Sequence, residues 1–133
     1  MAFYRTREGA VTAADSFTAL GSLYGQSTTA AIQVPAGASQ IIGIMASVAS
    51  DSATNGATTF AIQLSGDGLS NGQETLCIGS QGVAGTPASN GSSNPSINYD
   101  VAIPCVGSNQ VSVAVAMDTD VGTLAASVTL VFA

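Results

Sequence analysis

The stretch QVSVAVAMDTDVGTLAASVTLVFA, residues 110–133, decides the fold class. Large apolar side chains occupy every second position on both sides of its acidic centre, with small or weakly polar residues between them. Successive strand residues point to opposite faces, so a period of two predicts strands with one apolar face. We therefore predict a pair of C-terminal strands around a turn at Asp118 and Asp120, whose apolar face buries against a second sheet. We expect the small, uncharged outward face of this pair to lie where subunits meet.

The rest of the chain repeats this pattern in short segments separated by Gly-, Asn- and Ser-rich turns. Further strands are predicted over 28–34, 40–50, 58–65, 74–79 and 97–103, with loops over 66–73 and 80–96. In the 40–50 segment, strict alternation places Ile42 and Ile44 on one face and Ile41 and Met45 on the other. No helix of useful length is predicted. The fold class is therefore all-β: an antiparallel two-sheet sandwich, with a jelly roll or another Greek-key connection as the expected wiring.

The chain length indicates one domain, because 133 residues suffice for a single core. Scaling of surface with mass predicts roughly 6,300 Å² exposed after folding. Residues 1–27 are the least regular part, and we interpret them as an extended N-terminal arm with a short turn or strand near 17–23. Residues 28–133 are the predicted β-sandwich (jelly-roll) domain. The arm is either a surface strand or frayed terminus, or a segment that docks on a neighbouring subunit.

The charge of the chain is low and acidic. Arg5 and Arg7 are its two basic residues, against eight carboxylates, for a net charge of -6. No nucleic acid and no membrane is expected as a partner, because phosphate and anionic lipid surfaces both attract basic proteins. The N-terminus has no apolar segment typical of a signal peptide. These observations predict assembly in a host cytoplasm, followed by release within a particle.

Catalytic residue types are scarce in the sequence. There is no His or Lys, so a Ser or Thr nucleophile would lack the usual base. Asp118 and Asp120 could in principle act as paired carboxylates, but acidic residues between two strands are ordinary turn chemistry. We therefore predict that the protein is not an enzyme, has no catalytic residues and uses no cofactor.

Two further groups could suggest a bound metal or a disulfide. Asp67, Asn71 and Glu74 could present oxygen ligands to Ca²⁺, but their spacing does not match an EF-hand loop, so no metal site is predicted. Cys77 and Cys105 are predicted to stay unbridged. If 74–79 and 97–103 formed a hairpin, Cys105 would lie beyond the strand opposite Cys77.

Five blocks of the chain carry a resemblance to virion proteins. They are VPAGASQIIGI (34–44), FAIQLSGDG (60–68), YDVAIP (99–104), SNQVSVAVAM (108–117) and ASVTLVFA (126–133). In strand rhythm and composition, the chain resembles single jelly-roll capsid and decoration proteins of viruses that infect bacteria or archaea. It resembles more loosely the trimeric jelly-roll domains of the tumour-necrosis-factor type. Neither resemblance supplies a motif with functional residues, and both imply a jelly roll that forms a homo-oligomer.

We therefore expect a virion structural protein, either a capsid subunit or an outer decoration subunit. Its expected partners are itself, as a trimer or higher assembly, and other virion proteins, and its expected location is the virion. The alternative is a receptor- or glycan-binding module, such as a fibre tip, that uses the loops 66–73 and 80–96. The predicted interface residues are Arg5, Arg7, Met45, Ala114 and Ala116.

Overall fold

The computed structural model describes residues 1–22, 30–50, 56–83, 96–118 and 123–133. These residues form ten strands and no helix. It follows that no described segment is a helix long and apolar enough to cross a membrane. The folded chain exposes 6404 Å², close to the area that its mass predicts.

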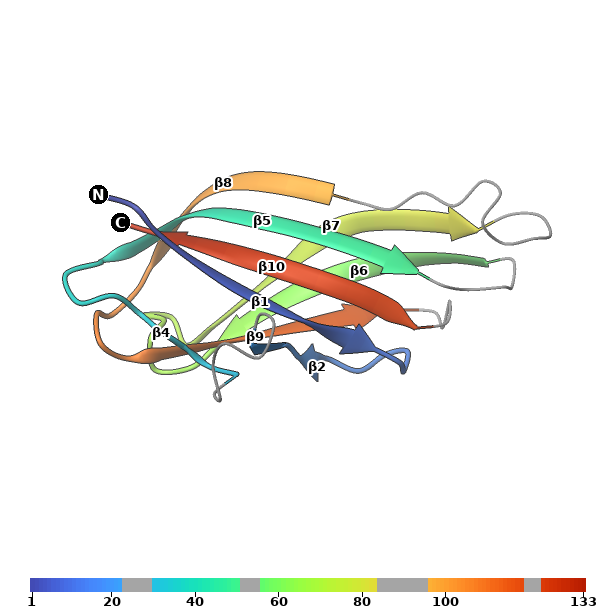
Figure 1. The fold of residues 1–133 in the computed structure, drawn as a ribbon, viewed down its shortest axis with the longest axis horizontal. Coiled ribbons are helices and arrows are strands. Elements are labelled where there is room, and N and C mark those ends of the chain that lie inside the picture. Colours follow the sequence, from blue (N-terminus) through green and yellow to red (C-terminus); the bar gives the residue numbers. More distant parts are fainter. Residues whose placement is uncertain (23–29, 51–55, 84–95, 119–122) are drawn as a thin grey trace.

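The strands form two antiparallel sheets that pack face to face (Figure 1). Sheet I contains, in spatial order, β3 (Gly21–Ser22), β1 (Phe3–Val11), β10 (Leu124–Phe132), β5 (Gln40–Ser50) and β8 (Ser96–Pro104). Sheet II contains β2 (Thr18–Ala19), β9 (Gln110–Met117), β6 (Gly56–Ser65) and β7 (Gln73–Val83), and the short β4 (Ile32–Gln33) also pairs with β9.

The connectivity is that of a jelly roll. The main strands run in the order β1-β10-β5-β8 in sheet I and β2-β9-β6-β7 in sheet II. Of the consecutive strands in the described residues, only β6 and β7 stay in one sheet; every other connection changes sheets. Two interlocked Greek keys produce this order. The predicted all-β sandwich with jelly-roll wiring is therefore confirmed, and β1 beside β10 brings the two chain ends together (Figure 1).

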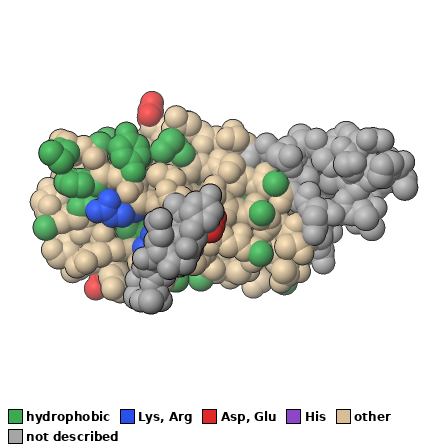
Figure 2. Space-filling view, viewed as in Figure 1, with side chains coloured by type: hydrophobic (Ala, Val, Ile, Leu, Met, Phe, Trp, Pro, Cys, Tyr) green, Lys and Arg blue, Asp and Glu red, His purple; other side chains and the backbone are tan. Residues whose placement is uncertain are grey.

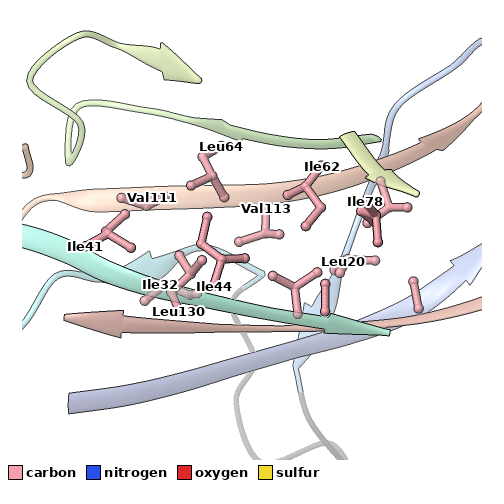
Figure 3. Close-up of a cluster of buried hydrophobic side chains, with 14 of the residues drawn as sticks. Leu20, Ile32, Ile41, Ile44, Ile62, Leu64, Ile78, Val111, Val113 and Leu130 are labelled. Carbon is pink, nitrogen blue, oxygen red and sulfur yellow. The ribbon is translucent and has the colours of Figure 1, made fainter. Parts of the chain in front are cut away.

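The core lies between the sheets and is almost entirely aliphatic (Figure 3). Inward positions from both sheets interdigitate because each strand presents alternate residues to the other sheet. The largest side chains with under 2% exposure are Phe60, Phe132, Leu20, Ile32, Ile41, Ile44, Ile62, Leu64, Ile78, Met117, Leu124 and Leu130. Of these, the inward positions 60, 62, 64, 117, 130 and 132 follow directly from the sequence alternation.

The C-terminal strands do not form one sheet, which corrects the sequence-based interpretation. β9 pairs with β6, β2 and β4, whereas β10 pairs with β1 and β5. β9 and β10 therefore lie in opposite sheets, and their two apolar faces meet across the core. A turn signal between two alternating strands predicts a hairpin and a sheet-to-sheet crossing equally well, because the alternation is the same in both.

The N-terminal residues contain a strand, which is one of the alternatives that the sequence left open. Residues 3–11, which the sequence analysis placed in an extended arm, form β1 and pair with β10 along their whole length. Where a short turn or strand was predicted near 17–23, the structure has the two short strands β2 and β3. The boundary at residue 27 thus separates a strand of the sandwich from the rest of the sandwich. Residues 23–27 of the predicted arm lie outside the described residues.

A β-bulge in β5 reverses the predicted orientation of two isoleucines. The register with β8 shifts between Ile41 and Gly43. Ile41 is consequently fully buried beside Ile44, whereas Ile42 is 36% exposed. An extra residue in one strand moves every residue before it to the opposite face, which strict alternation cannot anticipate.

The predicted hairpin between 74–79 and 97–103 is also wrong. β7 pairs with β6, and β8 pairs with β5, so the two segments belong to different sheets. β7 continues to Val83, beyond its predicted end at residue 79. Residues 84–95 of the predicted loop lie outside the described residues.

Candidate functional site

The centre of the outward face of sheet I is built largely from short polar side chains. On this face Thr129 of β10 stands between Thr6 of β1 and Met45 of β5. The Thr6 and Thr129 hydroxyls hydrogen-bond at 2.7 Å, and those of Ser47 and Ser127 at 3.0 Å. These bonds hold the short polar groups against each other rather than extending them into solvent.

Within sheet I, charged residues lie only on β1 and β8, which flank the two central strands. The central strands β5 and β10 contain none, and Glu8 of β1 and Asp100 of β8 are the acidic residues of the flanking strands. Figure 2 shows this side of the molecule as mostly uncharged apart from the arginine side chains, in blue, and a few acidic side chains, in red. Two shallow hollows, of about 300 and 150 Å³, open on either side of Ser47 and Ser127. The outward face of sheet I therefore has shallow hollows but carries almost no charge.

The outward face of sheet II has the same character. Ala114 and Ala116 of β9 lie beside Gln63 and Ala61 of β6, and neither strand contains a charged residue. A hollow of about 240 Å³ opens at one end of this face. It is lined by Asp15, Phe17, Thr59, Ala61, Ala116, Met117 and Asp118.

The five predicted interface residues therefore lie on three separate surfaces. Met45 lies on the outward face of sheet I, and Ala114 and Ala116 lie on the outward face of sheet II. The outward positions of β9 and β10 were predicted to share one surface, which is wrong because the two strands lie in different sheets. Arg5 and Arg7 occupy a third surface, at the β1 side of the sandwich.

The two arginines lie in a cleft between β1 and the β4–β9 region of sheet II. Its volume is about 590 Å³, and it is lined by Arg5, Arg7, Ala31, Gln33, Val34, Pro35, Ala36, Ser108 and Gln110. Arg7 donates from Nε to the Ala30 carbonyl and from Nη2 to the Ala31 carbonyl, both at 3.0 Å, and from Nη1 to the Thr6 carbonyl at 2.8 Å. Partial burial and the neighbouring Arg5 charge together lower the pKa of Arg7. The two arginines were recognisable in the sequence by their charge, but the cleft has no local sequence signal.

The three residues weighed as Ca²⁺ ligands have partners within the protein. The Asn71 amide donates to the Glu74 carboxylate at 3.3 Å. The Asp67 carboxylate instead accepts the backbone N–H of Gln110 at 2.9 Å. In the described parts of the chain, no three His, Cys, Asp or Glu side chains cluster in a way that could hold a metal ion. Asp67 here joins the 66–72 loop to the start of β9.

Asp118 has a structural position at the end of β9. Its Oδ1 accepts the Thr58 hydroxyl at 2.6 Å and the Thr59 N–H at 2.9 Å. These bonds join the end of β9 to β6. Asp120, its predicted neighbour in the turn, lies outside the described residues.

Cys77 and Cys105 are both free thiols, and the hairpin on which the prediction of no disulfide was argued is absent. Cys77 is exposed on β7, and Cys105 is buried. The carbonyl of Cys77 accepts the Tyr99 hydroxyl at 2.6 Å. Because Tyr99 is on β8, this bond joins sheet I to sheet II at the β7–β8 side of the sandwich.

Comparison with known proteins finds relatives by fold alone. No protein-family model matches the sequence, and no curated protein is significantly similar to it. A chain in the structure of infectious bursal disease virus, Gx strain, superimposes with a TM-score of 0.51 at 11% identity over 99% of this chain. A chain of the T13 particle of the same virus gives a TM-score of 0.47 at 12% identity over 96% of this chain.

A third structure, the CBM22-1–GH10 modules of xylanase 10B from Clostridium thermocellum, gives a TM-score of 0.42 at 12% identity over 96% of this chain. The chain spans 31% of the length of each viral chain and 24% of the xylanase chain. The first of the three structures thus supports the two-sheet β fold described above.

Proposed function

We propose that this protein is a virion structural subunit, of the capsid or of its outer decoration, that acts by assembling with copies of itself. The observation that carries the proposal is the absence of charge from the central strands of both sheets. The four central strands β5, β10, β6 and β9 contain no Asp, Glu, Lys or Arg. A monomeric domain usually keeps a quarter to a third of its surface charged for solubility.

The arrangement of the outward faces of the two sheets suits an assembly with several neighbours per subunit. They lie on opposite sides of the sandwich, so two neighbours could be contacted at once. Small side chains let two backbones approach closely. Because these strands carry no charge, contact between them requires no charged group to be desolvated. The similar fold of the chain from infectious bursal disease virus supports the proposal at the level of architecture. Other virion proteins would then be further partners, and the virion its location.

Placing a lysine on each face tests the proposal. Ser127→Lys inserts a charge at the centre of sheet I, and Ala114→Lys does so on sheet II. Ser70→Lys, on the exposed 66–72 loop, is the matched control because it adds the same charge outside both faces. We expect at least one face variant to lose assembly by light scattering, because an unpaired buried charge costs several kcal/mol. If both assemble as the control does, neither face is an interface.

A receptor- or glycan-binding module is the competing function for the same fold. A glycan array separates the two functions, since a shell or decoration subunit that acts only by assembly should bind no glycan selectively. Selective, saturable binding by a protein that stays monomeric would replace the structural function with a recognition function.

A further inference from the structure

Arg5 and Arg7 pair with core residues of β10 and so belong to the inner face of sheet I. Residues paired directly across two strands share a face, and Arg5 pairs with Leu130 and Arg7 with Val128. Both partners are buried, with 0% and 1% exposure. The two arginine side chains therefore start from the inner face of sheet I at the β1 side of the sandwich. There they line the cleft instead of packing in the core.

The two arginines differ in how their donors are used. Arg7 is half-buried and donates hydrogen bonds from its Nε and both Nη groups to three backbone carbonyls, which fixes its side chain. Arg5 is exposed, and its one hydrogen bond among the described residues runs from Nη1 to the adjacent Tyr4 carbonyl. A guanidinium has five N–H donors in a planar fork, so Arg5 presents most of its donors to the cleft.

The remaining lining of the cleft favours an anion. None of its described lining residues is acidic, and Gln33, Ser108 and Gln110 add amide and hydroxyl groups. The Gln33 amide donates to the Ser108 carbonyl at 3.4 Å, which holds that wall in place. Two like charges with no carboxylate between them repel each other, and an oxyanion bound between them would remove that repulsion.

We propose that this cleft binds a carboxylate presented by a second copy of this chain. Arg5 would contact the carboxylate, and Arg7, held in place by its three hydrogen bonds, would line the cleft beside it. The inference rests on the proposed function, because it supposes self-assembly. Charge complementarity points to a second copy: each chain carries eight carboxylates, and its two basic residues both line this cleft. Copies with a net charge of -6 repel unless acidic groups of one meet the positive cleft of another.

The first arm of the test measures carboxylate binding without assembly. The chain contains two arginines and no His, Lys or Trp, so the arginine Nε–H region of a ¹⁵N NMR spectrum holds two signals. Sodium glutarate is titrated at a protein concentration where the wild type is monomeric, with sodium chloride at matched ionic strength as the reference. We expect the Arg5 signal to shift saturably with glutarate and not with chloride, and Arg5→Gln to remove the binding.

The second arm measures self-association by sedimentation velocity at low and high salt. Arg5→Gln should weaken association about tenfold at low salt, the effect of losing one hydrogen-bonded charge. Gln73→Glu, exposed and outside the cleft, gives the same change in net charge and should weaken it less. Circular dichroism verifies that both variants fold.

Each alternative outcome has a distinct meaning. If assembly occurs but Arg5→Gln and Gln73→Glu behave alike, carboxylate docking is overturned while the proposed function stands. If the protein stays monomeric and glutarate still binds saturably, the cleft serves a free carboxylate and the second-copy proposal is overturned. If no arginine signal moves and assembly is unaffected, the arginines only protect an exposed sheet edge.

Discussion

Gly68→Ala tests whether the 66–72 loop is held against β9 as described. A Cβ at Gly68 would lie 2.7 Å from the Gln110 carbonyl oxygen and 2.7 Å from Cγ2 of Val111. The Gly68 N–H donates to the same Gln110 oxygen at 2.7 Å, so the loop cannot withdraw without losing that bond. Overpacking of this kind costs about 1–3 kcal/mol. We expect the upper end, about 3 kcal/mol, because two of the three nearest atoms belong to the β9 backbone.

Gly72→Ala is the matched control from the same loop. Gly72 has a φ of +78°, but a Cβ there would meet no atom within 4 Å. Its cost is therefore backbone strain alone, about 1 kcal/mol. Urea unfolding at one protein concentration should separate the two midpoints by about 1 M, given a slope of roughly 2 kcal/mol/M. Equal midpoints for the two variants would refute the packing of this loop on β9.

Three further predictions concern the β7–β8 side and the thiols. Tyr99→Phe removes the hydroxyl that joins the two sheets and should cost about 1 kcal/mol in urea unfolding, whereas no change would mean that the bond adds nothing. Cys77 should react with a thiol reagent much faster than Cys105, and equal rates in the folded protein would contradict the burial of Cys105. Burial raises the pKa of Cys105 above its ordinary value of 9.0, so unfolding free energy should fall as pH rises above about 9. Cys105→Ala should remove that fall, as a urea series over pH would show.

Alternation in the sequence was sufficient to predict the strands and most of their inward faces. Phe60 and Leu130 are buried as the period of two requires. What alternation could not supply is the partner of each strand, because pairing depends on contacts between residues far apart in the chain. The assignment of β9 and β10 to one sheet failed for this reason.

The candidate surfaces were predictable only in part. The absence of charge from β5, β6, β9 and β10 is visible in the sequence, but which outward faces coincide depends on the sheet order. Arg5 and Arg7 could be recognised as unusual by composition. Their inward direction follows from the register with β10, and the cleft follows from the position of β4. Neither has a local sequence signal.

The oligomeric state of the wild-type chain tests the central claim most directly. Light scattering combined with sedimentation velocity at micromolar concentration should find a trimer or a larger assembly, because the outward faces of both sheets would then be covered. A single species with the mass of one chain, 13.0 kDa, under these conditions would contradict an assembly function for this jelly roll.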